Sequence, residues 1–206
     1  MEAQEKKQVN MREGTCILLF AVAANLLMQL LIGITQVCIE KGTGRNLAHS
    51  DYFQLVAMLF LQVAFIAVPL IYFFVRREHA PVLKYPIRPA PSSALGLVLA
   101  PLSIFAFFFP AQLFAMLLEK IGCTFATVVN FDTAGKIVLG IVAMVLVAPC
   151  VEELIFRGFL LSGLRDSFKK RSAALLCGLA FSLMHMNPEQ TVYQFFLGCT
   201  SAYFAI

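Results

Sequence analysis

The residues best suited to do chemistry in this chain are two adjacent carboxylates and an arginine inside an apolar stretch. The segment VAPCVEELIFRGFL carries Glu152, Glu153 and Arg157. Each charge in hydrocarbon costs roughly 2.5 to 3.5 kcal/mol even on the lenient insertion scale. In an α-helix Glu153 and Arg157 share a face, whereas Glu152 points about 100° away from Glu153 and can address a different neighbour. These three residues are therefore candidates for catalysis.

A histidine is expected at a similar depth on the next apolar segment. His185 ends the run LLCGLAFSLMH, 14 residues after Arg171, and Glu153 lies 12 residues before Arg165. Consecutive antiparallel helices that start from one membrane edge place both side chains about 18 to 21 Å from that edge. A carboxylate and an imidazole that meet there can activate water for hydrolysis, while the arginine holds the second carboxylate as its anion.

A structural interpretation of the same residues stands beside this one. The pair of Glu153 and Arg157 could lock two helices, and a membrane histidine can simply donate a hydrogen bond to a carbonyl. Glu152 and the depth-matched His185 favour the functional interpretation. Pro149, just before the carboxylates, lacks an amide hydrogen, so the helix is expected to kink or admit water there.

The composition identifies the solvent around these residues. Of the 206 residues, 60% are hydrophobic and only 14% are charged, against roughly 25% charged residues in a soluble domain. The sequence therefore predicts a multi-pass integral membrane protein with the lipid bilayer as its partner. The formal charge of +4 reflects the orientation bias described below and gives no reason to expect a nucleic-acid partner.

The fold class predicted from the apolar segments is all-α, a polytopic transmembrane helical bundle. A cytoplasmic tail, residues 1–14, precedes one transmembrane domain, residues 15–206, of about six helices with the last incomplete. Apolar stretches near the roughly 20 residues needed to cross a bilayer run over 15–39, 52–75, 93–118, 136–164, 173–186 and from 194 onward.

Basic residues predict which way these segments face. Eleven Lys and Arg residues fall in the N-terminal tail and in the loops on the same side, and four fall in the alternate loops. Because Lys and Arg are enriched in cytoplasmic loops, the N-terminus is expected in the cytoplasm.

Two motifs resemble those of a known family. Glu152-Glu153-x-x-x-Arg157, followed by Phe181-x-x-x-His185, is similar to the first two motifs of the CPBP intramembrane metalloproteases, which include the CAAX prenyl endopeptidases and the bacteriocin-processing and self-immunity (Abi) proteins. The resemblance covers residues 138–206. It implies that Glu152 is the catalytic glutamate, that His185 is the first essential histidine and that Arg157 orients the carboxylates with Glu153 as its partner.

The resemblance also implies a metal and shows one departure. Glu152 and His185 would polarise water, alone or with zinc or another divalent metal that they would bind. Family members carry a further histidine, four residues before an asparagine, on a later helix, and no histidine follows His185 here. Because a catalytic zinc site usually has three protein ligands, we expect the 206-residue chain to be incomplete and inactive by itself.

The leading function is therefore an intramembrane endopeptidase whose Glu/His-activated water cleaves a membrane-associated peptide or a lipid-modified, prenylated protein of the CAAX type. Two alternatives stay open: a non-catalytic member of the same family that acts in bacteriocin self-immunity or as a scaffold, and, with less support, a transporter that relays protons.

Overall fold

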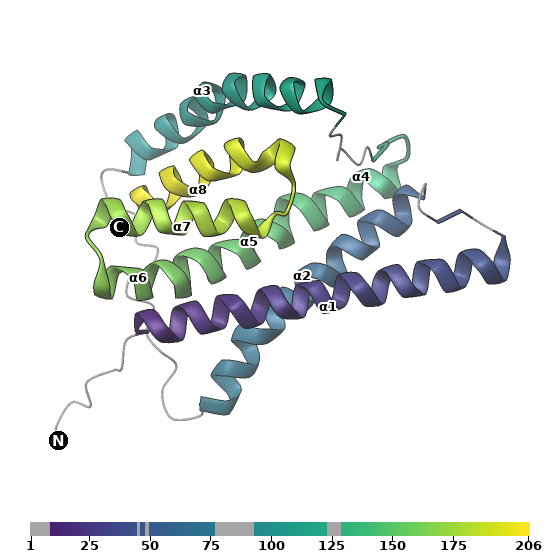
Figure 1. The fold of residues 1–206 in the computed structure, drawn as a ribbon, viewed down its shortest axis with the longest axis horizontal. Helices are drawn as coiled ribbons and strands as arrows, with labels where there is room; N and C mark the ends of the chain where they lie inside the picture. Colours follow the sequence, from purple (N-terminus) through teal and green to yellow (C-terminus); the bar gives the residue numbers. More distant parts are fainter. Residues whose placement is uncertain (1–8, 45, 48–49, 77–92, 123–128) are drawn as a thin grey trace. The chain divides into compact units, whose positions relative to one another are not determined.

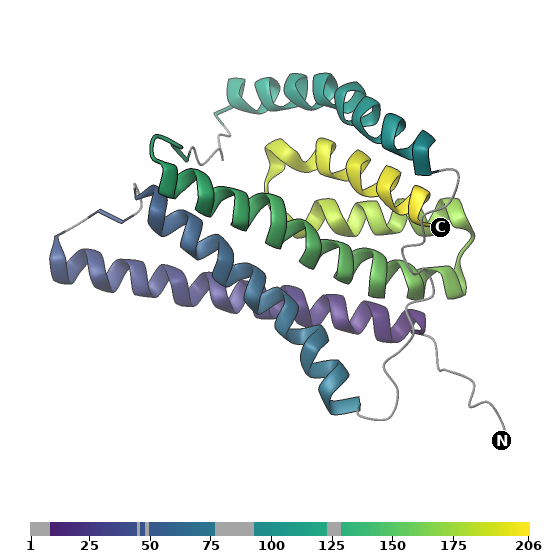
Figure 2. The same cartoon turned by 180° about the vertical axis from the view of Figure 1, so that it is seen from behind.

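The structure, a computed structural model, describes residues 9–44, 46–47, 50–76, 93–122 and 129–206. Every regular element in these residues is a helix (Figures 1 and 2), which confirms the predicted all-α fold class. Most of the predicted N-terminal tail, residues 1–8, and most of the basic second loop, residues 77–92, lie outside the described residues.

The helices follow the predicted apolar segments, with ends that shift by a few residues. The first three are α1 (Met11–Thr43), α2 (Asp51–Arg76) and α3 (Ser93–Lys120). The fourth segment is one helical run in five parts: α4 (Ala134–Gly140), η1 (Ile141–Val147), α5 (Ala148–Glu153), η2 (Leu154–Leu161) and α6 (Ser162–Ser167). Then come α7 (Lys170–Met184), the 3-10 turn η3 (Pro188–Gln190) and α8 (Thr191–Ala205).

The fourth segment departs from the α-helix that the sequence predicts, because η1 and η2 are π-helical. At the end of η1 the amide of Ala148 donates to the carbonyl of Ala143, five residues back. Pro149 comes next and cannot donate to Val145, the carbonyl four residues back. The disturbance expected at this proline is thus a wider helical turn, of the kind often found at functional sites.

Three helices in the described residues are long and apolar enough to cross a membrane: Met11–Thr43, Asp51–Tyr72 and Ala134–Ser167. Large apolar side chains stand exposed along the helices, among them Phe20 (67%), Phe74 (74%) and Phe109 (77%). Such a surface is stable against lipid, so these helices support the predicted membrane protein. The cytoplasmic orientation of the N-terminus stays a prediction.

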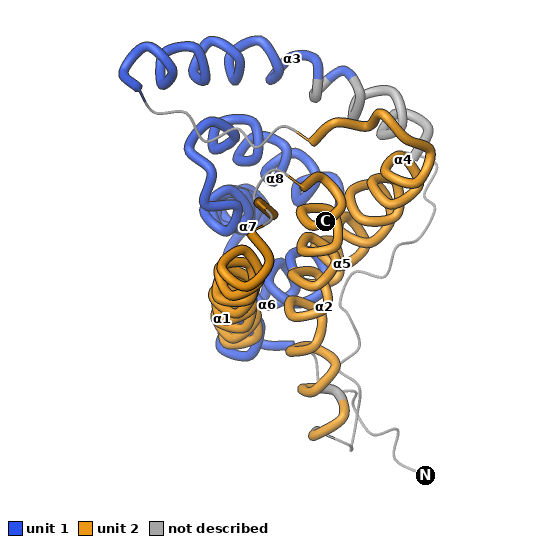
Figure 3. The backbone as a smooth tube through the Cα atoms, turned by 90° about the vertical axis from the view of Figure 1, so that its right-hand side faces the viewer, with its two compact units in different colours: residues 1–15, 82–127, 156–206 blue, residues 16–81, 128–155 orange. Residues whose placement is uncertain are grey.

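Contacts divide the chain into two compact units (Figure 3). Unit 1 comprises residues 1–15, 82–127 and 156–206, and unit 2 comprises residues 16–81 and 128–155. The boundary in the fourth segment falls between Ile155 and Phe156, within η2. The single transmembrane domain over residues 15–206 stays a prediction.

In unit 1, α7 and α8 lie side by side (Figures 1 and 2), and two glycines allow their close approach. A Cβ added to Gly198 would lie 2.9 Å from the Cα of Gly178, and one added to Gly178 would lie 2.7 Å from the backbone nitrogen of Cys199. Ala202, one turn after Gly198, is fully buried. Small residues four apart therefore form this helix interface.

Two other helices, α3 and the first turn of α1, also contribute to unit 1. On α3, Phe107 stacks on Phe196 of α8 with ring centroids 4.4 Å apart. The first turn of α1 begins with a capping box, in which Glu13 N donates to Asn10 Oδ1 at 2.8 Å and Asn10 N donates to Glu13 Oε2 at 3.2 Å. That reciprocal pair explains why α1 starts at Met11, four residues before the predicted Thr15.

Polar contacts in unit 2 join helices that are distant in sequence. Lys136 Nζ bonds Asp51 Oδ2 at 2.6 Å and Asp132 Oδ1 at 2.8 Å, tying the starts of α2 and α4. Asn25 Nδ2 donates to the carbonyl of Leu61 at 3.2 Å, between α1 and α2. The Asn25 bond satisfies an amide that would be costly to leave unpaired among apolar helices.

Candidate active site

The two predicted catalytic carboxylates lie at the end of α5, in unit 2. Glu152 and Glu153 are the last two residues of that helix and both are half-buried. The amide of the next residue, Leu154, donates to the carbonyls of Cys150 and Val151. The helix therefore continues through the carboxylates into η2 without a break.

The π-helical form of η2 changes which residues share a face. Our prediction that Glu153 and Arg157 lie one above the other assumed an α-helix, in which residues four apart align. In a π-helix the hydrogen bonds join residues five apart, so a spacing of four does not by itself establish that two residues of η2 align. Glu153 belongs to unit 2 and Arg157 to unit 1, so the pairing of these two residues stays a prediction.

Arg157 itself is buried in unit 1, with 9% of its surface exposed. Its Nη2 donates a hydrogen bond to the Oγ of Ser201 on α8. The hydroxyl of Ser201 in turn donates to the carbonyl of Leu197 at 2.7 Å. A hydroxyl has one proton and two lone pairs, so Ser201 makes both bonds at once and connects α8 to the motif arginine.

The second motif packs directly on this arginine. The Arg157 guanidinium carbon lies 4.9 Å from the centroid of the Phe181 ring, within cation–π range. Phe181 is buried and meets the ring of Phe156 edge-on, with centroids 5.0 Å apart. It also meets the imidazole of His185, with centroids 4.7 Å apart. Phe181 therefore contacts both the arginine of one motif and the histidine of the other.

A backbone bond orients the imidazole of His185. Its Nδ1 lies 2.8 Å from the carbonyl oxygen of Phe181, one turn back. Since a carbonyl only accepts, Nδ1 carries the proton of this bond, and in the neutral ring Nε2 carries the lone pair. Nε2 is then the atom that can accept a proton or bind a metal, and a backbone carbonyl on the other ring nitrogen is the usual partner of such a histidine.

The chain turns back immediately after His185, and local bonds hold the turn. Met186 has a positive φ of 47°, a conformation that ends α7. Asn187 caps the following turn by accepting a bond from Glu189 N at 3.0 Å. The buried Ser182 donates to the carbonyl of Thr191 at 2.7 Å, joining α7 to α8 across the turn. These bonds fix the end of α7, and so the position of His185.

The structure thus brings together two of the four predicted site residues, Arg157 and His185, which both contact Phe181 in unit 1. Glu152 and Glu153 belong to unit 2, and their convergence on His185 stays a prediction. Sequence reasoning missed Ser201. In the sequence Ser201 is distinguished only as a hydroxyl in an apolar segment, and this does not indicate that Arg157 is its partner.

The residues that the structure describes gather no group of three His, Cys, Asp or Glu side chains suited to hold a metal ion. A catalytic zinc site uses three protein ligands, so Glu152 and His185 do not by themselves complete one. Zinc stays a prediction.

Comparison with known proteins agrees with the motifs. Residues 134–206 match a protein family described as type II CAAX prenyl endopeptidase Rce1-like. The matched region contains both motifs and confirms the family resemblance that they indicate. No curated protein and no solved structure matches the chain.

Proposed function

From the similarity of residues 134–206 to a family of prenyl endopeptidases, we propose that this chain is an intramembrane endopeptidase that hydrolyses a peptide bond in a membrane-associated or lipid-modified substrate. One observation carries the proposal. The arginine of the first motif packs on the phenylalanine of the second, and the carbonyl of that phenylalanine orients His185.

In the proposed reaction Glu152 is the general base. It takes a proton from a water molecule while the water oxygen attacks the carbonyl carbon of the peptide, and it passes that proton to the amine nitrogen as the C–N bond breaks. Arg157 carries a positive charge five and four residues after the two glutamates, and its proposed role is to orient the carboxylates. Glu153 is its proposed partner.

His185 positions the same water. Because its Nδ1 proton is engaged with the Phe181 carbonyl, Nε2 can accept the second hydrogen of the attacking water. This arrangement points one lone pair of the water oxygen at the peptide carbonyl, which lowers the entropic part of the barrier. A bound zinc would supply Lewis-acid activation of that water, and no step here depends on it.

The test uses protein expressed from the complete gene and reconstituted in liposomes, with a quenched fluorescent peptide in prenylated and unmodified forms. Removal of a general base costs about 100- to 10,000-fold in rate, so Glu152→Gln should lower kcat by that range. His185→Ala should do the same. Glu119→Gln, which changes an exposed carboxylate at the end of α3, should leave kcat unchanged.

Each outcome separates the competing functions. Cleavage of the prenylated peptide alone supports a lipid-modified substrate, and loss of cleavage with a chelator supports a metal. Wild-type turnover in Glu152→Gln overturns the assigned base. A folded wild-type protein that cleaves neither peptide favours the non-catalytic alternative.

A further inference from the structure

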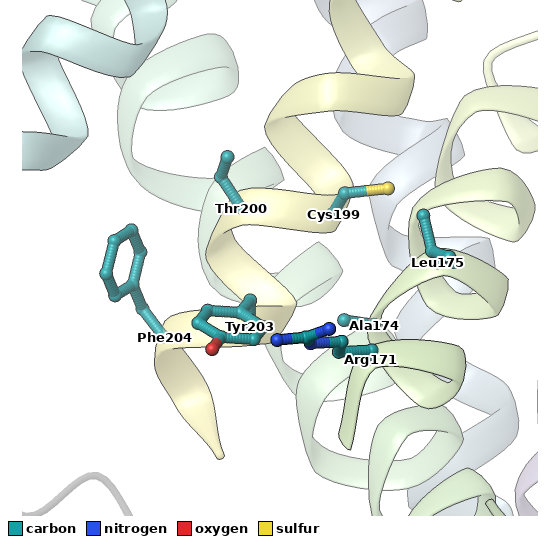
Figure 4. Close-up of a pocket in the computed structure, with 7 residues that line it drawn as sticks. All are labelled: Arg171, Ala174, Leu175, Cys199, Thr200, Tyr203 and Phe204. Atoms are coloured by element: carbon teal, nitrogen blue, oxygen red, sulfur yellow. The ribbon is translucent and has the colours of Figure 1, made fainter. Parts of the chain in front are cut away.

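A groove between α7 and α8 in unit 1 is lined by no residue of either motif. Its volume is about 510 Å³, within the roughly 300 to 1,000 Å³ of small-molecule sites. Ala174 and Leu175 of α7 form one wall, and Cys199 and Phe204 of α8 form the other (Figure 4). These side chains are largely apolar, so the groove suits a hydrocarbon chain.

One end of the groove is basic. Arg171 and Tyr203 line it at the start of α7 and the end of α8 (Figure 4). Lys170 lies beside them, with its Nζ 4.3 Å from the centroid of the Tyr203 ring. The site therefore combines an apolar wall with two cationic side chains at one end.

These cations occupy an electrostatically unfavourable place. Lys170 and Arg171 lie in the first turn of α7, Lys169 is its N-cap, and that turn contains no acidic residue. Positive side chains at a helix N-terminus oppose the helix dipole, which favours negative charge there. No carboxylate in the described part of the chain forms an ion pair with any of the three. An anion at this end would offset both the repulsion among the cations and the dipole.

We propose that the groove binds an anionic phospholipid of the bilayer, with its phosphate on Arg171 and Lys170 and the start of an acyl chain between Leu175 and Phe204. The apolar walls favour a lipid over free phosphate. The cations, which no carboxylate among the described residues neutralises, favour an anionic headgroup over a zwitterionic one. Basic pockets between helices at the cytoplasmic side select such headgroups, and the basic-residue bias predicts that this end faces the cytoplasm. The proposal is independent of peptidase activity.

The sequence allows a direct test because it contains no tryptophan. Phe204→Trp places a single fluorophore in the groove, and Phe20→Trp places one on an exposed position of α1 as the matched control. Each variant is reconstituted into vesicles of phosphatidylcholine and phosphatidylglycerol, with either lipid carrying brominated acyl chains that quench tryptophan on contact. At each position, the ratio of quenching by brominated phosphatidylglycerol to quenching by brominated phosphatidylcholine measures the preference for the anionic lipid.

In the Phe204→Trp variant we expect a preference for phosphatidylglycerol about fivefold or more above that in the Phe20→Trp variant, since one basic residue near an anionic surface contributes about this factor. Adding Arg171→Ala to Phe204→Trp should lower the preference about fivefold, and Arg171→Lys should keep most of it. Circular dichroism checks that each variant keeps its helical content.

Equal preference in the two tryptophan variants, or an Arg171→Ala variant with unchanged preference, would overturn the proposal. Preferential quenching by brominated phosphatidylcholine would assign a zwitterionic occupant instead. If a prenylated peptide relieves the quenching in the Phe204→Trp variant while phosphatidylglycerol shows no preference, the groove binds the lipid of a substrate and the proposal is wrong.

Discussion

The bond between Arg157 and Ser201 predicts a specific loss of stability when the hydroxyl is removed. Ser201→Ala deletes a hydrogen-bond acceptor of a guanidinium whose residue is only 9% exposed. The neighbouring Thr200 is a matched control, because its hydroxyl donates to the carbonyls of Phe196 and Leu197 within its own helix. Thr200→Ala therefore removes a hydroxyl from the same turn without touching Arg157.

Two estimates bound the size of the effect. Hydrogen bonds to charged groups contribute about 1.5 to 3 kcal/mol in proteins, whereas side-chain bonds between membrane helices average about 0.6 and reach about 1.7 kcal/mol. The two ranges overlap near 1.5 kcal/mol, which we expect for this charged, buried pair. Alanine is the better helix former at both positions, so the gain in helix propensity largely cancels in the difference between the two variants. Ser201→Ala should thus lower the free energy of unfolding by about 1.5 kcal/mol more than Thr200→Ala.

Reversible unfolding in mixed detergent micelles measures these free energies, and a double-mutant cycle isolates the pair. Arg157→Met removes the charge, and in that background Ser201→Ala should cost almost nothing. We expect a coupling energy of about 1 to 1.5 kcal/mol between the two positions. The effects of independent sites usually add to within about 0.3 kcal/mol. A coupling energy below this value would show that Ser201 does not bind Arg157.

Three further predictions concern packing, charge and topology. Gly198→Val should destabilise the fold by about 1 to 3 kcal/mol in thermal unfolding, because the valine side chain would overlap α7. Gly33→Ala, at a position with no neighbour within 4 Å, should be neutral or stabilising. Equal effects of the two substitutions would contradict the close approach of α7 and α8. Lys136→Met breaks bonds to two aspartates, so its loss of stability should shrink in about 1 M salt, and a salt-independent loss would refute the ionic contribution. In a cysteine-free background an impermeant thiol reagent should label Lys170→Cys from the cytoplasmic side and Lys41→Cys from the other, and the reversed pattern would refute the orientation.

Much of the secondary structure was predictable from the sequence. Apolar stretches long enough to cross a bilayer must satisfy their backbone groups internally, and only helices and closed barrels do so. The predicted segments therefore correspond to helices, and the predicted start at Thr15 was late only because the capping box of Asn10 and Glu13 extends α1 by one turn. Pro149 predicted a disturbance in the fourth segment, but its form as a π-helical stretch depends on which carbonyls the neighbouring amides reach.

The candidate site residues were selected from the sequence in the same way, and their chemical roles stay predictions. Glu152, Glu153, Arg157 and His185 stand out because charged and titratable groups are costly in an apolar segment. All four lie within residues 134–206, the region of the family match. Their types and spacing determine what reaction they could support. The sequence alone supported no more than a matching depth for His185 and Glu153.

Contacts between distant residues belong to the tertiary structure alone. Ser201 lies 44 residues after Arg157, and its bond to the guanidinium exists because α8 returns along α7 after the turn at Met186. The groove at Arg171 likewise lies between α7 and α8, which approach each other closely at Gly178 and Gly198. A sequence pattern indicates which residues each segment must bury, because hydrophobicity is a property of each residue separately. A hydrogen bond or a cavity depends instead on which side chains folding brings within a few ångströms of each other.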